Sequence, residues 1–94
     1  MKELKKVICT KLSEEIHFLN GKLIINQFGY RKTWKVELYG VEDLSLLDNM
    51  FFESKVEEFE FICINGETLV GNIIVKTIEN DMAELLGDGP LNLK

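Results

Sequence analysis

KVEEFEFICINGETLVGNIIVKT, residues 55–77, is the longest β-type pattern in the chain. Two apolar arms flank Asn65-Gly66, a dipeptide that suits a two-residue type I′ turn because both of its positions need a positive φ. Counting outward from this turn places Phe61 opposite Val70. Side chains alternate along a strand, so the hairpin should have one core face. The residues predicted on that face are Phe59, Phe61, Cys63, Thr68 and Val70.

The second arm of this hairpin needs an irregularity to keep its apolar side chains on the core face. A strict register would turn Ile73 and Val75 away from that face. One extra residue at Gly71-Asn72 would bring both side chains back beneath Phe59. Glycine within a strand pattern is a common mark of a β-bulge, so we predict a bulge at Gly71-Asn72.

A second hairpin is predicted from residues 14–19 and 22–27, joined by Asn20-Gly21. Here the two-residue register places Phe18 opposite Leu23 on the core side. The same register directs His17, the only histidine, to the outer face. Nothing in the local pattern places a catalytic or metal-binding partner beside it. We therefore interpret His17 as a partly exposed strand residue. Ile16 and Ile25 are predicted to face each other on the core side.

The remaining segments complete a mainly β pattern with one short helix. Residues 5–12 fit either a strand or a short helix. Leucines at three-residue spacing predict a helix over residues 41–50, which would act as a crossover or as a lid over one end of a sheet. Asn80-Asp81 marks a third turn, and residues 83–86 read as the last strand. Residues 87–90 would close that strand; they lack the Lys-Ser/Thr of a phosphate-binding loop.

Residues 30–39 interleave basic and aromatic side chains, as single-strand nucleic-acid binders do. Strand parity counts against that interpretation. Trp34 shares a face with Tyr30 and with the apolar residues Val36 and Leu38, so we predict Trp34 as a core residue. Arg31 falls on the opposite face.

Bulk properties indicate one compact unit. The chain has 94 residues, of which 46% are hydrophobic, enough for one modest core. No stretch approaches the roughly 18–20 apolar residues of a membrane span, and the basic start lacks the apolar run of a signal peptide. We predict one domain over residues 1–94, located in the cytoplasm, with no membrane partner. Cys9 and Cys63 suit neither a disulfide framework nor a metal site and are predicted as small core residues.

Charge is distributed unevenly along the chain. Residues 1–35 contain eight Lys/Arg against three Asp/Glu, a net charge of +5, and residues 36–94 contain three against thirteen, a net charge of −10. Pairing between neighbouring strands could neutralise the two halves against each other. Otherwise the asymmetry would give a dipolar surface that steers association with a charged partner or another copy.

Together these patterns predict a mainly β fold, either a small antiparallel barrel or a compact sandwich with one short helix. No catalytic, metal or cofactor motif is identified, so we expect a non-catalytic protein-interaction or assembly module that binds itself or a charged protein. The candidate interaction residues are Arg31, Lys32, Lys35, Glu57, Glu58 and Glu60. The alternative is a small-barrel nucleic-acid-binding protein that uses the strand Tyr30–Lys35. The net charge of −5 counts against this alternative.

Overall fold

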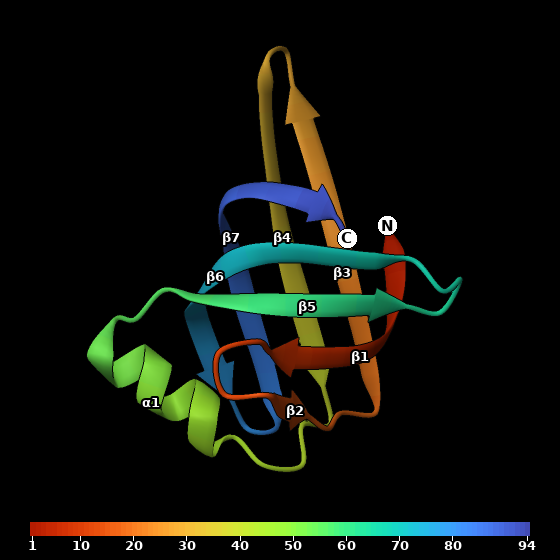
Figure 1. Ribbon diagram of the computed structural model, residues 1–94. Helices are drawn as coiled ribbons and strands as arrows, with labels where there is room; N and C mark the ends of the chain where they lie inside the picture. The colour runs from red at the N-terminus through yellow and green to blue at the C-terminus, as the bar shows by residue number, and fades with distance from the viewer.

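The computed structural model describes residues 1–94 and shows a closed six-stranded antiparallel barrel with one extra strand and one helix (Figure 1). Strand order around the barrel is β1-β3-β4-β7-β6-β5, and β5 pairs back to β1. The barrel is thus the correct choice of the two predicted architectures. The elements are β1 (Lys2–Cys9), β2 (Glu14–Ile16), β3 (Asn20–Phe28), β4 (Arg31–Tyr39), α1 (Ser45–Glu53), β5 (Glu57–Cys63), β6 (Thr68–Glu79) and β7 (Met82–Leu93).

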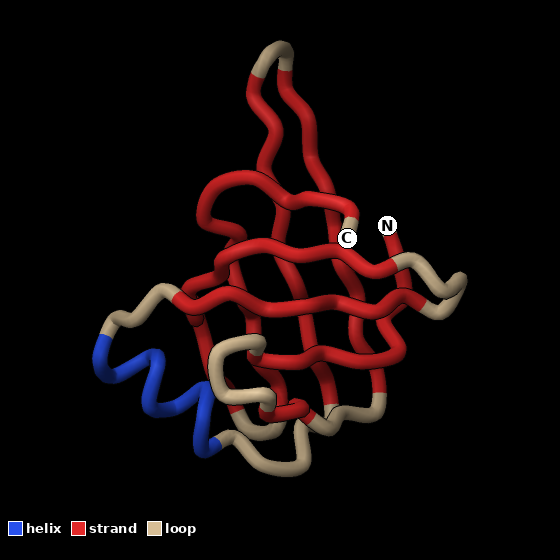
Figure 2. Tube along the Cα trace, viewed as in Figure 1, coloured by secondary structure: helices blue, strands red, loops and turns tan.

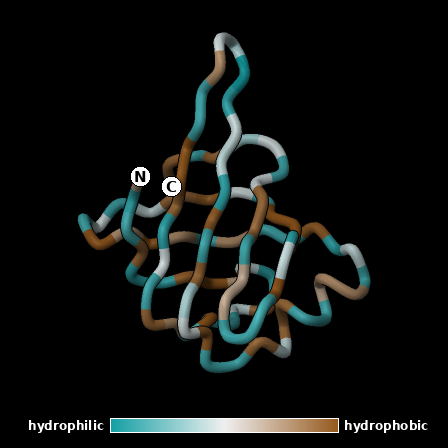
Figure 3. The backbone as a smooth tube through the Cα atoms, turned by 180° about the vertical axis from the view of Figure 1, so that it is seen from behind, coloured by the Kyte–Doolittle hydropathy of each residue, from teal (hydrophilic) through white to brown (hydrophobic).

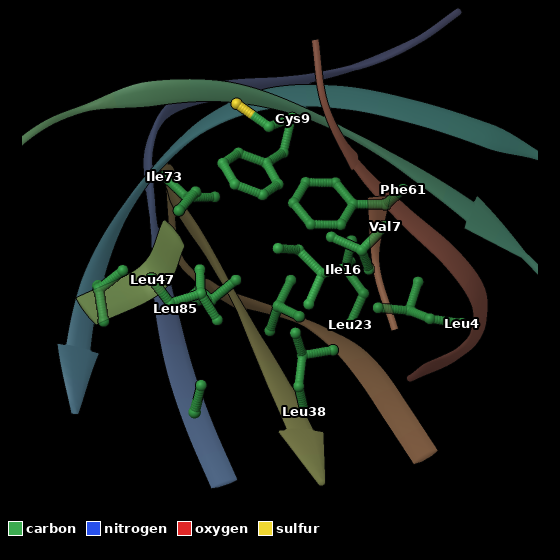
Figure 4. Close-up of a cluster of buried hydrophobic side chains, with 14 of the residues drawn as sticks. Leu4, Val7, Cys9, Ile16, Leu23, Leu38, Leu47, Phe61, Ile73 and Leu85 are labelled. Carbon is green, nitrogen blue, oxygen red and sulfur yellow. The ribbon is translucent and has the colours of Figure 1, made fainter. Parts of the chain in front are cut away.

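The barrel interior is filled by a cluster of 19 buried hydrophobic residues, part of which is shown in Figure 4. Phe59 and Phe61 are fully buried, and their rings stack with centroids 6.2 Å apart. Trp34 is also buried and packs edge-on against Phe61, which confirms its predicted place in the core. Cys9 and Cys63 are buried free thiols within the same cluster, again as predicted.

The turn of the long hairpin differs from the predicted type I′ turn. Gly66 donates its N–H to the carbonyl of Cys63 over 2.9 Å and has φ +93°, whereas Asn65 does not adopt a positive φ. This is a longer connection, in which a turn is followed by one left-handed residue. The side chain of Asn65 accepts the N–H of Glu67 over 2.9 Å, which stabilises this form.

The longer turn moves the β5–β6 register by one residue. Phe61 pairs with Leu69 instead of Val70, and Glu57 pairs with Ile73. Because a shift by one residue exchanges the two faces of a strand, Leu69 and Ile73 are buried in the core. The predicted core positions of Thr68 and Val70 are therefore wrong. Both residues are half-buried.

A register shift does occur at Gly71-Asn72, where a bulge was predicted, but the β5–β6 ladder runs through these two residues without a shift, so the predicted extra residue on β6 is wrong. The shift lies in the β6–β7 ladder. Gly71 pairs with Leu91 and Asn72 with Asp88, so the extra residues belong to β7. The bend is therefore made by the Gly-Pro segment of β7, opposite Gly71.

The second predicted hairpin is not formed. Asn20 and Gly21 begin β3 and pair with β4, while β2 pairs with β1. A Cβ at Gly21 would lie 2.9 Å from side-chain atoms of both Leu38 and Phe18, so close packing requires glycine here. The actual hairpin partner of β3 is β4, joined through Gly29-Tyr30 with Gly29 at φ +62°. Ile16 and Leu23 are nevertheless buried, as predicted for residues on the core side.

The chain ends are more regular than predicted. Residues 5–12 belong mainly to β1, which ends at Cys9, so the strand alternative is correct. Strand β7 does not stop at residue 86 but bends and continues to Leu93, where it pairs with β6. The helix lies slightly later than predicted, over Ser45–Glu53, and buries Leu47 and Met50 in the core. The third turn, at Asn80-Asp81, is confirmed.

Candidate interaction site

The β3–β4 hairpin extends beyond the barrel as a two-stranded ribbon (Figures 1 and 2). Its two strands pair with each other as far as Phe28 and Arg31. The neighbouring strands stop earlier, since β1 reaches only Leu23 on one side and β7 reaches only Lys35 on the other. Residues 24–34, called the hairpin arm below, therefore have no strand partner on either outer edge.

The outer half of the hairpin arm is polar, with two exposed aromatic residues near its tip. In Figure 3 brown and teal segments alternate along the barrel strands, whereas the projecting end of the arm is mostly teal and white. Phe28 and Tyr30 are exposed by 76% and 108% of their reference areas. Arg31 and Lys32 are exposed and form no ion pair, and residues 24–34 include no acidic residue. The arm is therefore an unpaired cationic and aromatic surface.

A hollow of about 480 Å³ lies in the fork where β7 bends away from β4. We call it the β4–β7 fork. The volume is within the range of roughly 300–1,000 Å³ that is typical of ligand pockets. Lys32 is the only titratable residue that lines it. The lining residues are Lys32, Thr33, Trp34, Gly87, Gly89, Pro90 and Leu91.

Trp34 forms a fixed wall of the β4–β7 fork. Its indole Nε1 donates to the carbonyl of Gly89 over 3.0 Å, and only 5% of the residue is exposed. A Cβ at Gly71 would lie 2.6 Å from the indole, and one at Gly87 would overlap it. The indole is thus held between the glycines of β6 and β7 on one side and Phe61 on the other.

The three predicted basic residues are divided between the hairpin arm and the barrel. Arg31 and Lys32 lie on the arm, whereas Lys35 lies where β4 joins β7. Lys35 Nζ is 3.3 Å from a carboxylate oxygen of Glu84 and 3.5 Å from one of Glu37. Its hydrogen bond to Glu84 and the charge of Glu37 raise the pKa of Lys35. Lys35 is therefore engaged within the barrel wall.

The three predicted acidic residues lie on β5, one of the strands that form the barrel wall. Strand β5 is paired on both edges, with β1 and with β6. Glu60 forms an ion pair with Lys94 over 2.6 Å, and Glu58 accepts a hydrogen bond from the hydroxyl of Thr10 over 2.9 Å. Glu57 has the same strand parity as Phe59 and is half-buried at the start of β5. The structure does not bring the six predicted residues into one site.

Charge asymmetry is partly neutralised across the barrel. Lys2 and Glu67 pair over 2.7 Å, and Lys35 and Glu84 pair as described above. These contacts join the basic first part of the chain to the acidic second part. The arm keeps its free cations, while the acidic β4–α1 connection and β6–β7 turn lie at the opposite end of the barrel (Figure 1).

Two parts of this site are not among the predicted residues. Phe28 could have been found from its position beside the turn glycine Gly29, because residues flanking a projecting turn are exposed. The contribution of residues 87–91 had no local signal, since it depends on the bend of β7 and on its pairing with β6.

No helix is both long enough and apolar enough to cross a membrane. Comparison of the chain with protein-family models, with curated proteins and with solved structures finds no match. The hairpin arm and the β4–β7 fork are the two features of the structure that could bind a partner.

Proposed function

We propose that this protein is a non-catalytic protein-interaction module and that the hairpin arm is its binding element. The observation that carries the proposal is the pair of unpaired strand edges along residues 24–34. An exposed strand edge invites pairing with another chain, and a barrel otherwise removes such edges. Exposed aromatic residues and arginine are the residue types enriched at protein interfaces. The partner is either a charged protein or a second copy.

The lining of the β4–β7 fork supports the non-catalytic part of the proposal. General acid–base chemistry needs positioned titratable groups, and among the lining residues only Lys32 can titrate. His17 is exposed, and its imidazole lies 3.7 Å from a carboxylate oxygen of its neighbour Glu15. We propose the cytoplasm as the location because two free thiols suit a reducing compartment.

Photo-crosslinking in cells of the native host tests this proposal. A Tyr30→p-benzoylphenylalanine variant places the reactive group at the tip of the hairpin arm. We expect it to form a defined adduct with another protein or with a second copy. A Phe52→p-benzoylphenylalanine variant is the matched control, because Phe52 is also an exposed aromatic residue but lies on α1, away from the arm.

The result that supports the proposal is an adduct from position 30 that position 52 does not give. Mass spectrometry of the adduct distinguishes a foreign protein from a second copy. Absence of any protein adduct at position 30, or the same adducts from both positions, would contradict the proposal.

Nucleic-acid binding is the second candidate function, and the exposed tip of the hairpin arm favours it. Phe28 and Tyr30 could stack on bases, and Arg31 and Lys32 could contact phosphates. Trp34, one of the aromatic residues in the pattern that suggested this function, is buried and unable to stack. The net charge of −5 also opposes phosphate binding, so we rank this function second.

We expect no binding of nucleic acid tighter than the non-specific range of about 10⁻⁴–10⁻⁶ M at physiological salt. The two cations on the hairpin arm neutralise too few phosphates for tighter binding. Fluorescence anisotropy with single-stranded and duplex oligonucleotides measures this directly. A submicromolar constant that weakens with added salt and with Lys32→Glu would promote the second candidate.

A further inference from the structure

Backbone groups along the outer half of β4 have a defined direction. In a two-residue hairpin the pair that closes the turn is hydrogen-bonded, so Arg31 directs its N–H and C=O toward β3. The direction alternates along the strand, and Lys32 therefore directs its backbone groups to the opposite side. Further along the same side, Val36 and Leu38 face β7. Beside Lys32, on this same edge of β4, β7 is no longer paired.

We propose that an extended acidic peptide segment of another protein binds there as an added strand, alongside residues 31–34 of β4. This inference rests on the proposed function and specifies its partner. The added strand would continue the barrel sheet on the side that β7 leaves after Leu86. Main-chain hydrogen bonds to a sheet edge supply affinity in this mode of recognition, and side-chain pockets supply specificity.

The β4–β7 fork supplies such a pocket next to the open edge. Trp34, Pro90 and Leu91 give it apolar walls, and Gly89, at which a Cβ would meet nothing within 4 Å, leaves room beside them. Alternate side chains of an added strand point to the same face. A peptide residue on that face would therefore place an apolar side chain in the fork.

Charge on the hairpin arm indicates an acidic peptide. Arg31 and Lys32 flank the open edge from opposite faces of β4, and neither forms an ion pair. No acidic residue lines the β4–β7 fork, since Asp88, which lies between the lining residues Gly87 and Gly89, does not itself line it. A carboxylate next to the apolar residue on a bound strand would pair with Arg31, and one two residues from it, on the same face as the fork, would pair with Lys32.

A second copy of this chain fits the open edge less well. The acidic strand β5 is paired on both edges, so a folded copy does not offer it as an added strand. Pairing of two arms through β4 would bring Arg31 and Lys32 of one copy close to those of the other. Like charges on adjacent strands are destabilising.

Selection of peptides against the full-length protein tests this inference. A phage library of random octapeptides is the probe, and we expect enrichment of sequences with an apolar residue that has Asp or Glu one and two positions away. Affinities of the synthetic peptides are then measured by fluorescence anisotropy for a matched pair of proline variants. Lys32→Pro removes the N–H that faces the open edge of β4, and Gln27→Pro removes one that faces the open edge of β3. Proline is tolerated where the N–H of an edge strand has no partner, so both variants should fold.

We expect Lys32→Pro to weaken peptide binding by about tenfold or more, the loss of one to two charge-assisted or main-chain hydrogen bonds. Gln27→Pro should leave it within about twofold, and Lys32→Ala, which keeps the N–H, should lie between them. Arg31→Glu should also weaken binding of acidic peptides. Circular dichroism of each variant verifies the fold.

Three outcomes would overturn the inference. Peptides that bind the arm but respond to Gln27→Pro and not to Lys32→Pro would place the partner on the other edge and leave the proposed function standing. Enrichment of basic peptides, or of no peptide class, would exclude an acidic strand while arm-specific crosslinks could still support the proposed function. Peptides that ignore both proline variants, combined with no crosslink at position 30, would remove the inference and the proposed function together.

Discussion

Phe61→Ala is expected to lower the free energy of unfolding by about 3–5 kcal/mol, the usual range for an emptied aromatic site. Phe61 is fully buried, and its ring contacts two other aromatic residues, Trp34 at a centroid distance of 5.7 Å and Phe59 at 6.2 Å. A closed barrel wall restricts collapse around the cavity, because each strand is held by neighbours on both sides. The loss should therefore fall in the upper part of the range.

The matched comparison for Phe61→Ala is His17→Ala, which should cost less than about 1 kcal/mol. The imidazole of His17 is largely exposed, and the fold uses only its backbone carbonyl, which accepts the N–H of Glu42 over 2.9 Å. Urea unfolding of both variants, followed by circular dichroism, gives the two free energies. Equal losses would contradict the assignment of Phe61 to the centre of the core.

Gly87→Ala should destabilise the protein by about 1–3 kcal/mol through overpacking. A Cβ at this position would overlap the indole of Trp34, which is buried, hydrogen-bonded to Gly89 and supported from behind by Phe61. The indole must then move toward the β4–β7 fork. Trp34 is the only tryptophan, so its fluorescence reports this movement directly, as an emission shift to longer wavelength.

Asp88→Ala is the control for the glycine variant, because Asp88 is the exposed neighbour of Gly87 on β7. It should leave the melting temperature and the emission maximum nearly unchanged. If Gly87→Ala behaved like Asp88→Ala in both measurements, the close contact between β7 and Trp34 would be wrong.

Apolar alternation predicted much of the core correctly, and turn chemistry did not predict the register. Phe61 and Trp34 were assigned to the interior from strand parity alone, which is a local property. Asn-Gly occurs twice, but only Asn65-Gly66 lies in a turn, and that turn is one residue longer than expected. Gly21 serves close packing against Leu38 instead, a tertiary requirement that the dipeptide does not reveal.

The candidate site was predicted in part. Arg31 and Lys32 were identified from their position on a strand with aromatic neighbours, and both lie on the hairpin arm. The β4–β7 fork was missed because residues 87–90 resemble a strand end. Their bend keeps β7 paired with β6 while it leaves β4, and this depends on β6 partners that are distant in the sequence, such as Ile73 for Gly87 and Gly71 for Leu91. Glu58 and Glu60 are predicted as interaction residues, but each has a partner within the molecule.

Amide hydrogen exchange along β4, followed by NMR, tests the central claim that one edge of the hairpin arm is open. The N–H of Lys32 should exchange within about tenfold of the unprotected rate, while that of Leu38, which faces β7, should be protected to near the global stability of the fold. Thr33, which faces β3, should lie between them. If Lys32 were protected as strongly as Leu38, the edge would already be paired and the account would be contradicted.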